Sequence, residues 1–461
     1  MNLEQIHSVY FIGIGGIGMS SLARWFKQRG VTVSGYDKTE TTLTKRLASE
    51  GMDIHYVDDL DLVPKEIIED KAHSVIVYTP AVPKNHNELS FFMFGDYQIM
   101  KRSEMLGIIS RSHWTVAVGG THGKTTTSSM IAHILHETVG CSAFVGGIMT
   151  NYDSNLLIGD ENAPVVAEAD EFDRSFHRLS PNYSIVTSVD PDHLDIYGDQ
   201  SSMHEGYAEF LRKTKPGGKV LLQVKAAETI NEHLDFDYRT YGIDTGDVQA
   251  RVLRIANGAF VFNYHGKEVI KDVTLYVPGY HNVENATAAI TLALDYGIAP
   301  DKIKAALAGY KGVKRRFEYI IRTDEAIYID DYAHHPTEIQ ALLKSVKSLY
   351  PGKLITAIFQ PHLYSRTRDF QDGFAKSLEL ADDIILMDIY PAREEPIPGI
   401  TSEVILEKIN STNKMICERD RLIEVIAQKD PEVLLTVGAG DIDREVEKIK
   451  NYYLNDKKVE A

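Results

Sequence analysis

Two glycine-rich loops, each set between a short apolar run and a helical stretch, restrict what this chain can fold into. Gly13–Gly18 follows the apolar run Val9–Ile12, and Gly120–Thr127 follows Trp114–Val118. A strand that ends in glycines and passes into a helix is the repeating unit of parallel sheets with crossover helices. The same alternation continues as far as Val433–Val437, so we predict an α/β protein.

The length and the pattern of strands predict three consecutive domains. At about 150 residues per domain, a chain of 461 residues has room for three. The strand pattern restarts after Arg111 and again at the basic cluster Lys314–Arg316. We therefore predict a Rossmann-like N-terminal domain over residues 1–111, a central α/β domain with a phosphate loop over 112–313, and a Rossmann-like C-terminal domain over 314–461.

Charge, cysteine content and the N-terminal sequence exclude several classes of protein. A formal net charge of −17 argues against binding to nucleic acid or to an anionic membrane. Cys141 and Cys417 are the only cysteines and lie far apart in sequence, which fits a reducing cytoplasm. The chain starts without a signal peptide, and no apolar run reaches the roughly 18 residues of a membrane span. We expect a cytoplasmic protein with no membrane insertion.

The second glycine loop has the pattern of a phosphate-binding loop. In Gly120–Thr127, backbone N–H groups can turn inward onto phosphate oxygens, and the following helix Ser128–Thr138 adds partial positive charge. Lys124 is placed to reach β- and γ-phosphates, and the hydroxyl group of Thr125 to bind Mg²⁺. Val118 stands where the strict pattern has its first glycine, so the loop is a shortened variant.

The first glycine loop has the dinucleotide-binding pattern. Gly13–Gly18 fits G-x-G-x-x-G, and Asp37 follows at the end of the next strand. A loop that cradles a pyrophosphate serves NAD and a UDP-sugar equally well. The pattern therefore predicts a diphosphate ligand without choosing between these two.

Acidic residues follow two further strands. Glu168–Asp173 comes after Val165–Ala167, and Asp190–Asp195 comes after Ile185–Ser188. The carboxyl ends of parallel strands are where ligand sites lie in α/β proteins. Carboxylates at that edge, beside a phosphate loop, are the oxygen ligands that Mg²⁺ needs.

These segments together resemble the Mur ligase family over nearly the whole chain. Five segments match the family in order: Gly120–Thr127, Glu168–Asp173, Asp192–Asp195, Pro278–Ala286 and Arg315–Glu318.

Other stretches resemble the members that add alanine: Gly13–Met19, Asp330–Pro336, Phe359–His362 and Glu394–Gly399. One departure is Leu363, where those members often have arginine, which leaves Arg366 and Arg368 as the nearby cations.

The resemblance implies an ATP-dependent ligase of peptidoglycan synthesis, with UDP-N-acetylmuramate and L-alanine as its small-molecule substrates. The lactyl carboxylate would attack the γ-phosphorus of ATP, and the alanine amine would attack the resulting acyl phosphate. The implied cofactors are ATP and Mg²⁺ or Mn²⁺, and the implied assembly is a monomer or a homodimer.

The family pattern also implies the residues of the site. For ATP they are Gly120, Thr121, His122, Gly123, Lys124, Thr125, Thr126, His281, Asn282, Asn285, Arg316 and Asp331. For the UDP-sugar they are Gly13, Gly15, Gly16, Ile17, Gly18, Met19, Asp37 and Thr79. The implied metal ligands are Thr125, Glu168 and His193, and the implied catalytic residues are Lys124, Glu168, His193, His335 and Arg366.

Alternatives remain at this point. A recycling ligase that adds a murein tripeptide to UDP-N-acetylmuramate would share most of these segments, and a folate-type ligase would share the central domain. An NAD-dependent dehydrogenase would explain Gly13–Gly18 but not Gly120–Thr127. A regulatory ATPase would explain Gly120–Thr127 but not Gly13–Gly18. His335 is placed equally well to orient a substrate or to cap the helix Thr337–Leu349.

Overall fold

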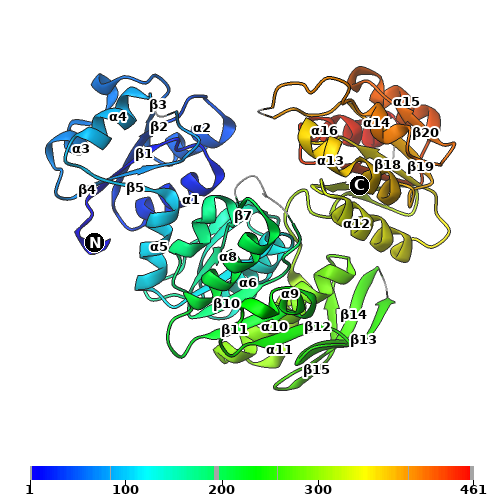
Figure 1. Ribbon diagram of the computed structural model, residues 1–461, viewed down its shortest axis with the longest axis horizontal. Coiled ribbons are helices and arrows are strands. Elements are labelled where there is room, and N and C mark those ends of the chain that lie inside the picture. The colour runs from blue at the N-terminus through cyan, green and yellow to red at the C-terminus, as the bar shows by residue number, and fades with distance from the viewer. Residues whose placement is uncertain (1–2, 84, 192–196, 257, 393, 457–461) are drawn as a thin grey trace. The chain divides into compact units, whose positions relative to one another are not determined.

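The chain forms three β-sheets with accompanying helices, coloured blue to cyan, green, and yellow to red in Figure 1. The structure, a computed structural model, describes residues 3–83, 85–191, 197–256, 258–392 and 394–456. Two compact units divide the chain. The first runs up to Arg251 and includes Asn263–Val273 and Glu284–Tyr310, and the second comprises Val252–Phe262, Thr274–Val283 and the chain from Lys311 on.

The N-terminal sheet has five parallel strands in the order β3-β2-β1-β4-β5. Its strands are β1 Ser8–Ile12, β2 Thr32–Tyr36, β3 Asp53–His55, β4 Ser74–Tyr78 and β5 Gln98–Lys101. Its helices are α1 Ile17–Gln28, α2 Thr42–Ser49, α3 Lys65–Glu69, α4 Asn87–Phe94 and α5 Arg102–Ser112. The strand order reverses between β1 and β4, and ligands of open α/β sheets bind at this switch point.

The central sheet has ten strands in the order β15-β14-β13-β12-β11-β10-β6-β9-β7-β8. They are β6 Thr115–Gly119, β7 Ser142–Met149, β8 Ser154–Leu157, β9 Val165–Glu168, β10 Tyr183–Val186, β11 Lys219–Gln223, β12 Arg239–Ile243, β13 Val248–Ala256, β14 Ala259–His265 and β15 Val269–Leu275. The associated helices are α6 Lys124–Thr138, the 3-10 helix η3 Phe172–Arg178, α8 Gln200–Arg212, α9 Val224–Thr229, α10 Tyr280–Tyr296 and α11 Pro300–Gly309. Because β6 lies between β9 and β10, the segments that follow these three strands meet at one edge of the sheet.

The C-terminal sheet has six strands in the order β16-β17-β21-β18-β19-β20. Among the described strands of this sheet, only β16 pairs antiparallel, with β17. They are β16 Glu318–Arg322, β17 Ile327–Asp331, β18 Ile355–Phe359, β19 Asp383–Leu386, β20 Lys414–Ile416 and β21 Val433–Val437. The main helices are α12 Pro336–Leu349, α13 Tyr364–Leu378, α14 Glu403–Leu406, α15 Leu422–Lys429 and α16 Asp443–Asn451. Separate apolar clusters cover its two faces, as the continuous apolar runs of buried parallel strands require.

The N-terminal and central sheets share one hydrophobic core within the first unit. Trp25 of α1 packs in the same cluster as Phe144 of β7 and Leu156 of β8. The side-chain amide of Asn155, fully buried in β8, donates to the backbone oxygen of Ile17 at 2.7 Å and to the hydroxyl group of Ser21. The helix that follows the first glycine loop is thus attached directly to the central sheet.

The predicted α/β class is confirmed, but several helices begin earlier than predicted. Helix α12 begins at Pro336 and not at Thr337, and α6 begins at Lys124 and not at Ser128. The reason for the second difference is Gly123, whose left-handed φ of 82° lets the loop turn directly into the helix. The hairpin of β7 and β8 was not predicted, and the domain boundaries after residues 111 and 313 stay a prediction.

Two further properties bear on the class of protein. Cys141 and Cys417 are buried free thiols. Among the residues that the structure describes, no helix has both the length and the apolar character that crossing a membrane requires.

Candidate active site

The segment Gly120–Thr127 comprises the turn from β6 into α6 and the first turn of that helix, and it is closely packed against the segment that follows β10. Gly120 has a φ of 135°, and a Cβ atom there would lie 2.9 Å from the backbone nitrogen of Ser188 and would also meet the side chain of Thr187. No other residue type has both this backbone conformation and this small size. The strand-to-helix connection therefore requires glycine, as the phosphate-loop pattern indicates.

Hydrogen bonds fix the conformation of this loop. The hydroxyl group of Thr121 donates to the backbone oxygen of Asp190 at 2.7 Å, and the backbone N–H of His122 donates to Ser188 Oγ at 2.7 Å. Thr187 Oγ1 donates to the backbone oxygen of His122. Thr187 and Ser188 were missed as candidate residues. Their position at the end of a strand adjacent to β6 is the signal that could have found them.

Lys124 begins α6, and its side chain turns back over the loop. Its Nζ donates to the backbone oxygen of Gly120 at 2.5 Å and pairs with the Glu171 carboxylate at 2.7 Å. Burial alone would lower the pKa of Lys124, but the carboxylates of Glu171 and Glu168 outweigh this effect and raise it. The ammonium group stays charged inside the loop, which is the state that a phosphate-binding lysine needs.

Thr125 and Glu168 are brought together as predicted for metal ligands. The hydroxyl group of Thr125 donates to Glu168 Oε1 at 3.0 Å, and the backbone N–H of Gly146 donates to Glu168 Oε2 at 2.7 Å. A Cβ atom at Gly146 would lie 2.7 Å from both carboxylate oxygens, so Gly146 makes room for this carboxylate. Gly146 was missed, because nothing in the local sequence of β7 points to Glu168.

A hydroxyl oxygen and a carboxylate oxygen beside a phosphate loop fit the preference of Mg²⁺, which binds a few protein oxygens together with substrate phosphates. His193, the third predicted ligand, lies outside the described residues, as do Asp192 and Asp195. The ligand set stays a prediction.

The first glycine loop lies at the switch point between β1 and β4. The backbone N–H of Gly15 donates to Asp37 Oδ2 at 2.7 Å, and a Cβ atom at Gly15 would lie 2.8 Å from that oxygen. A Cβ atom at Gly13 would lie 2.6 Å from the methyl group of Thr79. Asp37 and Thr79 therefore both contact the loop, and Asp37 fixes its backbone.

The remaining residues predicted for this loop differ in position and in exposure. Gly16 precedes α1 as its N-cap, and Gly18 and Met19 lie in its first turn. Met19 is buried in the core, whereas the side chain of Ile17 is exposed.

Arg102, the first residue of α5, is a cation at this loop that was missed in the sequence. A Cβ atom at Gly18 would lie 2.9 Å from Arg102 Nη1, so the guanidinium group covers this glycine. Arg102 Nη2 also lies 3.8 Å from Asp170 Oδ2, in the acidic segment that follows β9. One cation thus lies beside both the first glycine loop and the acidic segment Glu168–Asp173.

The predicted ATP contacts of α10 differ in their surroundings. Asn285 is buried, and its Oδ1 lies 3.0 Å from the place that a Cβ atom would take at Gly123, beside the phosphate loop. Asn282 is also buried, and its amide donates to the backbone oxygen of Pro278 at 2.7 Å. His281 is exposed and lies against Gly279.

In the second unit, Asp331 ends β17 and binds two backbone N–H groups. Its carboxylate accepts from Phe317 and from Ala333, each at 2.7 Å. Burial raises the pKa of Asp331 to about 7, against the opposing effects of these N–H groups and of nearby Arg316. Arg316 directly precedes Phe317 in the chain and therefore lies near Asp331, and the assignment of both residues to ATP stays a prediction.

His335 is the N-cap of α12. The ring nitrogen Nδ1 of His335 accepts from the backbone N–H of Thr337 at 3.4 Å. The backbone N–H of His335 donates to Glu338 Oε2 at 3.2 Å. This reciprocal arrangement is a capping box. The capping alternative is thus present in the structure, and a role of His335 toward a substrate stays a prediction.

Arg366 lies in the first turn of α13, next to the segment that departs from the family pattern. Leu363 precedes this helix with a φ of 68°, an uncommon conformation for a non-glycine residue. Burial, followed by the charges of His334 and Arg366, lowers the pKa of His362 to about 4. His362 is therefore neutral near pH 7, which leaves Arg366 as a cation beside it.

A phosphate loop at the carboxyl edge of one α/β sheet, and a glycine loop at the switch point of another, define a multidomain nucleotide-binding enzyme. Family models for the Mur ligase catalytic domain, middle domain and glutamate ligase domain match residues 8–114, 118–293 and 315–440. The chain belongs to the Mur ligase family.

Relatives and solved structures agree with this assignment. The UDP-N-acetylmuramate–L-alanine ligase of Cytophaga hutchinsonii is 50% identical over 456 residues, which cover 98% of this chain and 97% of the relative. That of Flavobacterium johnsoniae is 48% identical, with 98% of each chain covered. The crystal structure of the Thermotoga maritima UDP-N-acetylmuramate–alanine ligase matches with a TM-score of 0.80 at 29% identity, covering 97% of this chain and 99% of that one.

Proposed function

We propose that this enzyme uses ATP to join L-alanine to the lactyl carboxylate of UDP-N-acetylmuramate in peptidoglycan synthesis. The observation that carries this proposal is the 50% identity to a ligase of that name over 98% of the chain. The phosphate loop supports it, because Lys124 and Thr125 occupy the lysine and hydroxyl positions of a pattern that binds nucleoside triphosphates, and hydrogen bonds to Gly120 and Glu168 fix their side chains. The structure of the murein peptide ligase from Psychrobacter arcticus matches at 23% identity, which shows a shared fold alone.

The reaction needs positioning and charge neutralisation more than covalent catalysis by the protein. A carboxylate oxygen of the lactyl group attacks the γ-phosphorus, the bond to the β-γ bridging oxygen breaks, and ADP leaves. The amine of alanine then attacks the carbonyl carbon of the acyl phosphate and loses a proton, and phosphate leaves as the amide forms. In our assignment, Lys124 binds the β- and γ-phosphate oxygens on which negative charge develops.

Thr125 and Glu168 would hold Mg²⁺ or Mn²⁺, which supplies further neutralisation of the phosphate oxygens when bound. Glu168 is suited to this task because Gly146 and Thr125 already fix both of its oxygens. For the UDP-sugar, we assign the diphosphate to the loop Gly13–Gly18, with Arg102 beside Gly18 as its counter-charge. Arg102 was not among the residues that the sequence indicated.

We further propose that the enzyme acts in the cytoplasm on these two small molecules and ATP. The two free thiols support this proposal, since cytosolic proteins keep their cysteines reduced.

The test is phosphate release with ATP, Mg²⁺ and UDP-N-acetylmuramate, with L-alanine, L-serine, glycine or the murein tripeptide supplied in turn. We expect release that depends on L-alanine and a product whose mass equals that of the two substrates less one water. Lys124→Ala is the inactive control, and Lys353→Ala, on the surface of the second unit, is the active one. Turnover with the tripeptide and none with alanine would assign the chain to the recycling reaction instead.

A further inference from the structure

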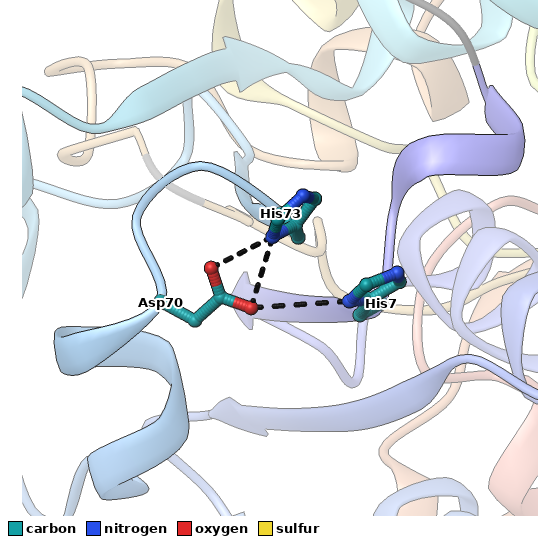
Figure 2. A group of neighbouring side chains, drawn as sticks. All are labelled: His7, Asp70 and His73. Atoms are coloured by element: carbon teal, nitrogen blue, oxygen red, sulfur yellow. Dashed lines mark hydrogen bonds and ion pairs between the residues drawn. The ribbon is translucent and has the colours of Figure 1, made fainter.

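His7, Asp70 and His73 form a cluster in the N-terminal domain that the ligase reaction does not use. Figure 2 shows both imidazole rings directed at one carboxylate. His7 directly precedes β1, His73 directly precedes β4, and Asp70 follows α3. The glycine loop lies at the opposite end of β1, about 17 Å away for a strand of five residues. The cluster is therefore separate from the first glycine loop, to which we assign the diphosphate.

The backbone places these three residues together. β1 and β4 are parallel neighbours with Ser8 opposite Ser74, so the two histidines stand side by side at the start of adjacent strands. The backbone N–H of His7 donates to the backbone oxygen of His73 at 2.9 Å. The rings stack with centroids 4.4 Å apart and an angle of 17° between their planes. The arrangement thus rests on the sheet and not on flexible side chains alone.

Asp70 is fixed by the turn that leads into β4. Its backbone oxygen accepts from the N–H groups of His73 and Ser74 at 3.3 and 3.0 Å. Its carboxylate lies 2.9 Å from Nδ1 of His73 and 3.9 Å from Nδ1 of His7. One donor atom from each of the three residues lies within 4.8 Å of the others.

These separations are close to those around a bound metal ion. Tetrahedral zinc has bonds of about 2.0–2.1 Å, which place neighbouring ligand atoms roughly 3.3 Å apart. A small rotation of the His7 ring would bring its Nδ1 to that separation. The His7 side chain is 66% exposed and that of His73 is 44% exposed, so solvent can reach the cluster and supply a fourth ligand.

We propose that His7, Asp70 and His73 bind one Zn²⁺ ion or a similar transition-metal ion. Two imidazoles and one carboxylate are a donor set for Zn²⁺, Ni²⁺ or Cu²⁺, whereas Mg²⁺ and Ca²⁺ prefer oxygen ligands throughout. A bound ion would tie the start of β1 to the turn before β4. It would therefore stabilise the folded N-terminal domain without entering the ligase reaction.

The test is a Zn²⁺ titration of the untagged full-length protein against a chromogenic chelator, with millimolar Mg²⁺ present to occupy oxygen sites. We expect wild-type protein to take up one more equivalent of Zn²⁺ than His7→Ala/His73→Ala. Each single variant should bind at that site at least tenfold more weakly, and His136→Ala, which removes an exposed histidine elsewhere, should bind as wild type does. Equal uptake by wild type and the double variant would overturn the proposal.

Electron paramagnetic resonance with one equivalent of Cu²⁺ gives a second, independent measurement. We expect hyperfine structure from two nitrogen ligands in wild type and from one in each single variant. Ligase activity without added transition metal should be the same in all these proteins, which shows that the variants are folded. A copper spectrum that is identical in wild type and both single variants would contradict the assignment.

Discussion

The ammonium nitrogen of Lys124 lies 2.7 Å from the carboxylate of Glu171, and the two side chains are only 14% and 4% exposed. The pair joins the first residue of α6 to the acidic segment after β9. Removing one member of a buried ion pair leaves the other charge uncompensated. Glu171 therefore sustains the charged state of the lysine to which we assign phosphate binding.

Glu171→Gln is expected to shift the alkaline limit of activity to lower pH. Burial lowers the pKa of a lysine, and in wild type the Glu171 and Glu168 charges outweigh that effect. Without the Glu171 charge the pKa of Lys124 falls, so the active charged form is lost earlier as pH rises. We expect kcat/KM to be about tenfold below wild type at pH 9 for each unit by which this pKa drops below 9.

The matched control for this profile is Asp170→Asn, which removes a neighbouring but more exposed carboxylate. It should shift the alkaline limit much less than Glu171→Gln does, because the charge of Asp170 raises the pKa of Lys124 less than the charges of Glu171 and Glu168 do. A Glu171→Gln enzyme with the wild-type limit would show that Glu171 does not control the charge of Lys124.

Glu168→Gln and Thr125→Ala are expected to raise the Mg²⁺ concentration needed for half-maximal activity. Both side chains present oxygens at the phosphate loop, and Gln or Ala is a weaker ligand than the group it replaces. We expect a change of at least about tenfold, or about 1.4 kcal/mol. Thr125→Ser keeps the hydroxyl group and should stay within a few-fold of wild type. An unchanged Mg²⁺ dependence in Glu168→Gln would remove this residue from the metal site.

Arg102→Ala is expected to raise KM for the UDP-sugar much more than KM for ATP. The guanidinium group covers Gly18 of the first glycine loop, where we assign the diphosphate. Hydrogen bonds to charged groups contribute about 1.5–3 kcal/mol, so the rise should be about ten- to a hundredfold. Arg102→Lys keeps the charge, and its KM for the UDP-sugar should lie between those of wild type and Arg102→Ala. Equal rises in both KM values would indicate a general disturbance of the first unit and not a contact with the sugar nucleotide.

Local sequence was sufficient to predict both glycine loops and the strands that flank them. The phosphate loop is fixed by glycine conformations and by the residues that follow one another along the chain, so Lys124 and Thr125 could be assigned directly. The same locality explains why the α/β class was predictable. Each unit of strand, loop and helix carries its own apolar pattern and its own turn residues.

Contacts between distant segments could not be predicted in this way. Glu171 was one of several acidic residues in a run, and only the placement of β9 beside β6 selects it as the partner of Lys124. Gly146 and Arg102 carry no local signal, because each acquires its role from a neighbour in another element. For His335 the local sequence is informative but ambiguous, because it fits a helix cap and a substrate ligand equally well. The structure shows that His335 caps α12.

Glu88 of α4 is expected to make the stability of the N-terminal domain fall as pH rises through 7. Its side chain is fully buried and accepts from the Tyr10 hydroxyl at 2.5 Å and from the Asp59 N–H at 3.2 Å. Burial raises its pKa to about 7, against the opposing effects of these two hydrogen bonds. His55, 3.7 Å away, supplies no counter-charge near pH 7 because burial lowers its own pKa.

The direction of this change in stability with pH follows from proton binding. Between the ordinary pKa of a glutamate and about 7, the folded state holds a proton that the unfolded state has released, so folding becomes less favourable as pH rises. Glu88→Gln keeps the shape and removes the titration. At pH 8 it should stabilise the domain by up to about 3 kcal/mol, from about 1.4 kcal/mol per pKa unit, and the gain should shrink towards pH 5. Hydrogen exchange of β1 and α4 measures this local stability in the full-length chain. A difference between variant and wild type that stays constant from pH 5 to pH 8 would show that Glu88 does not titrate in this range.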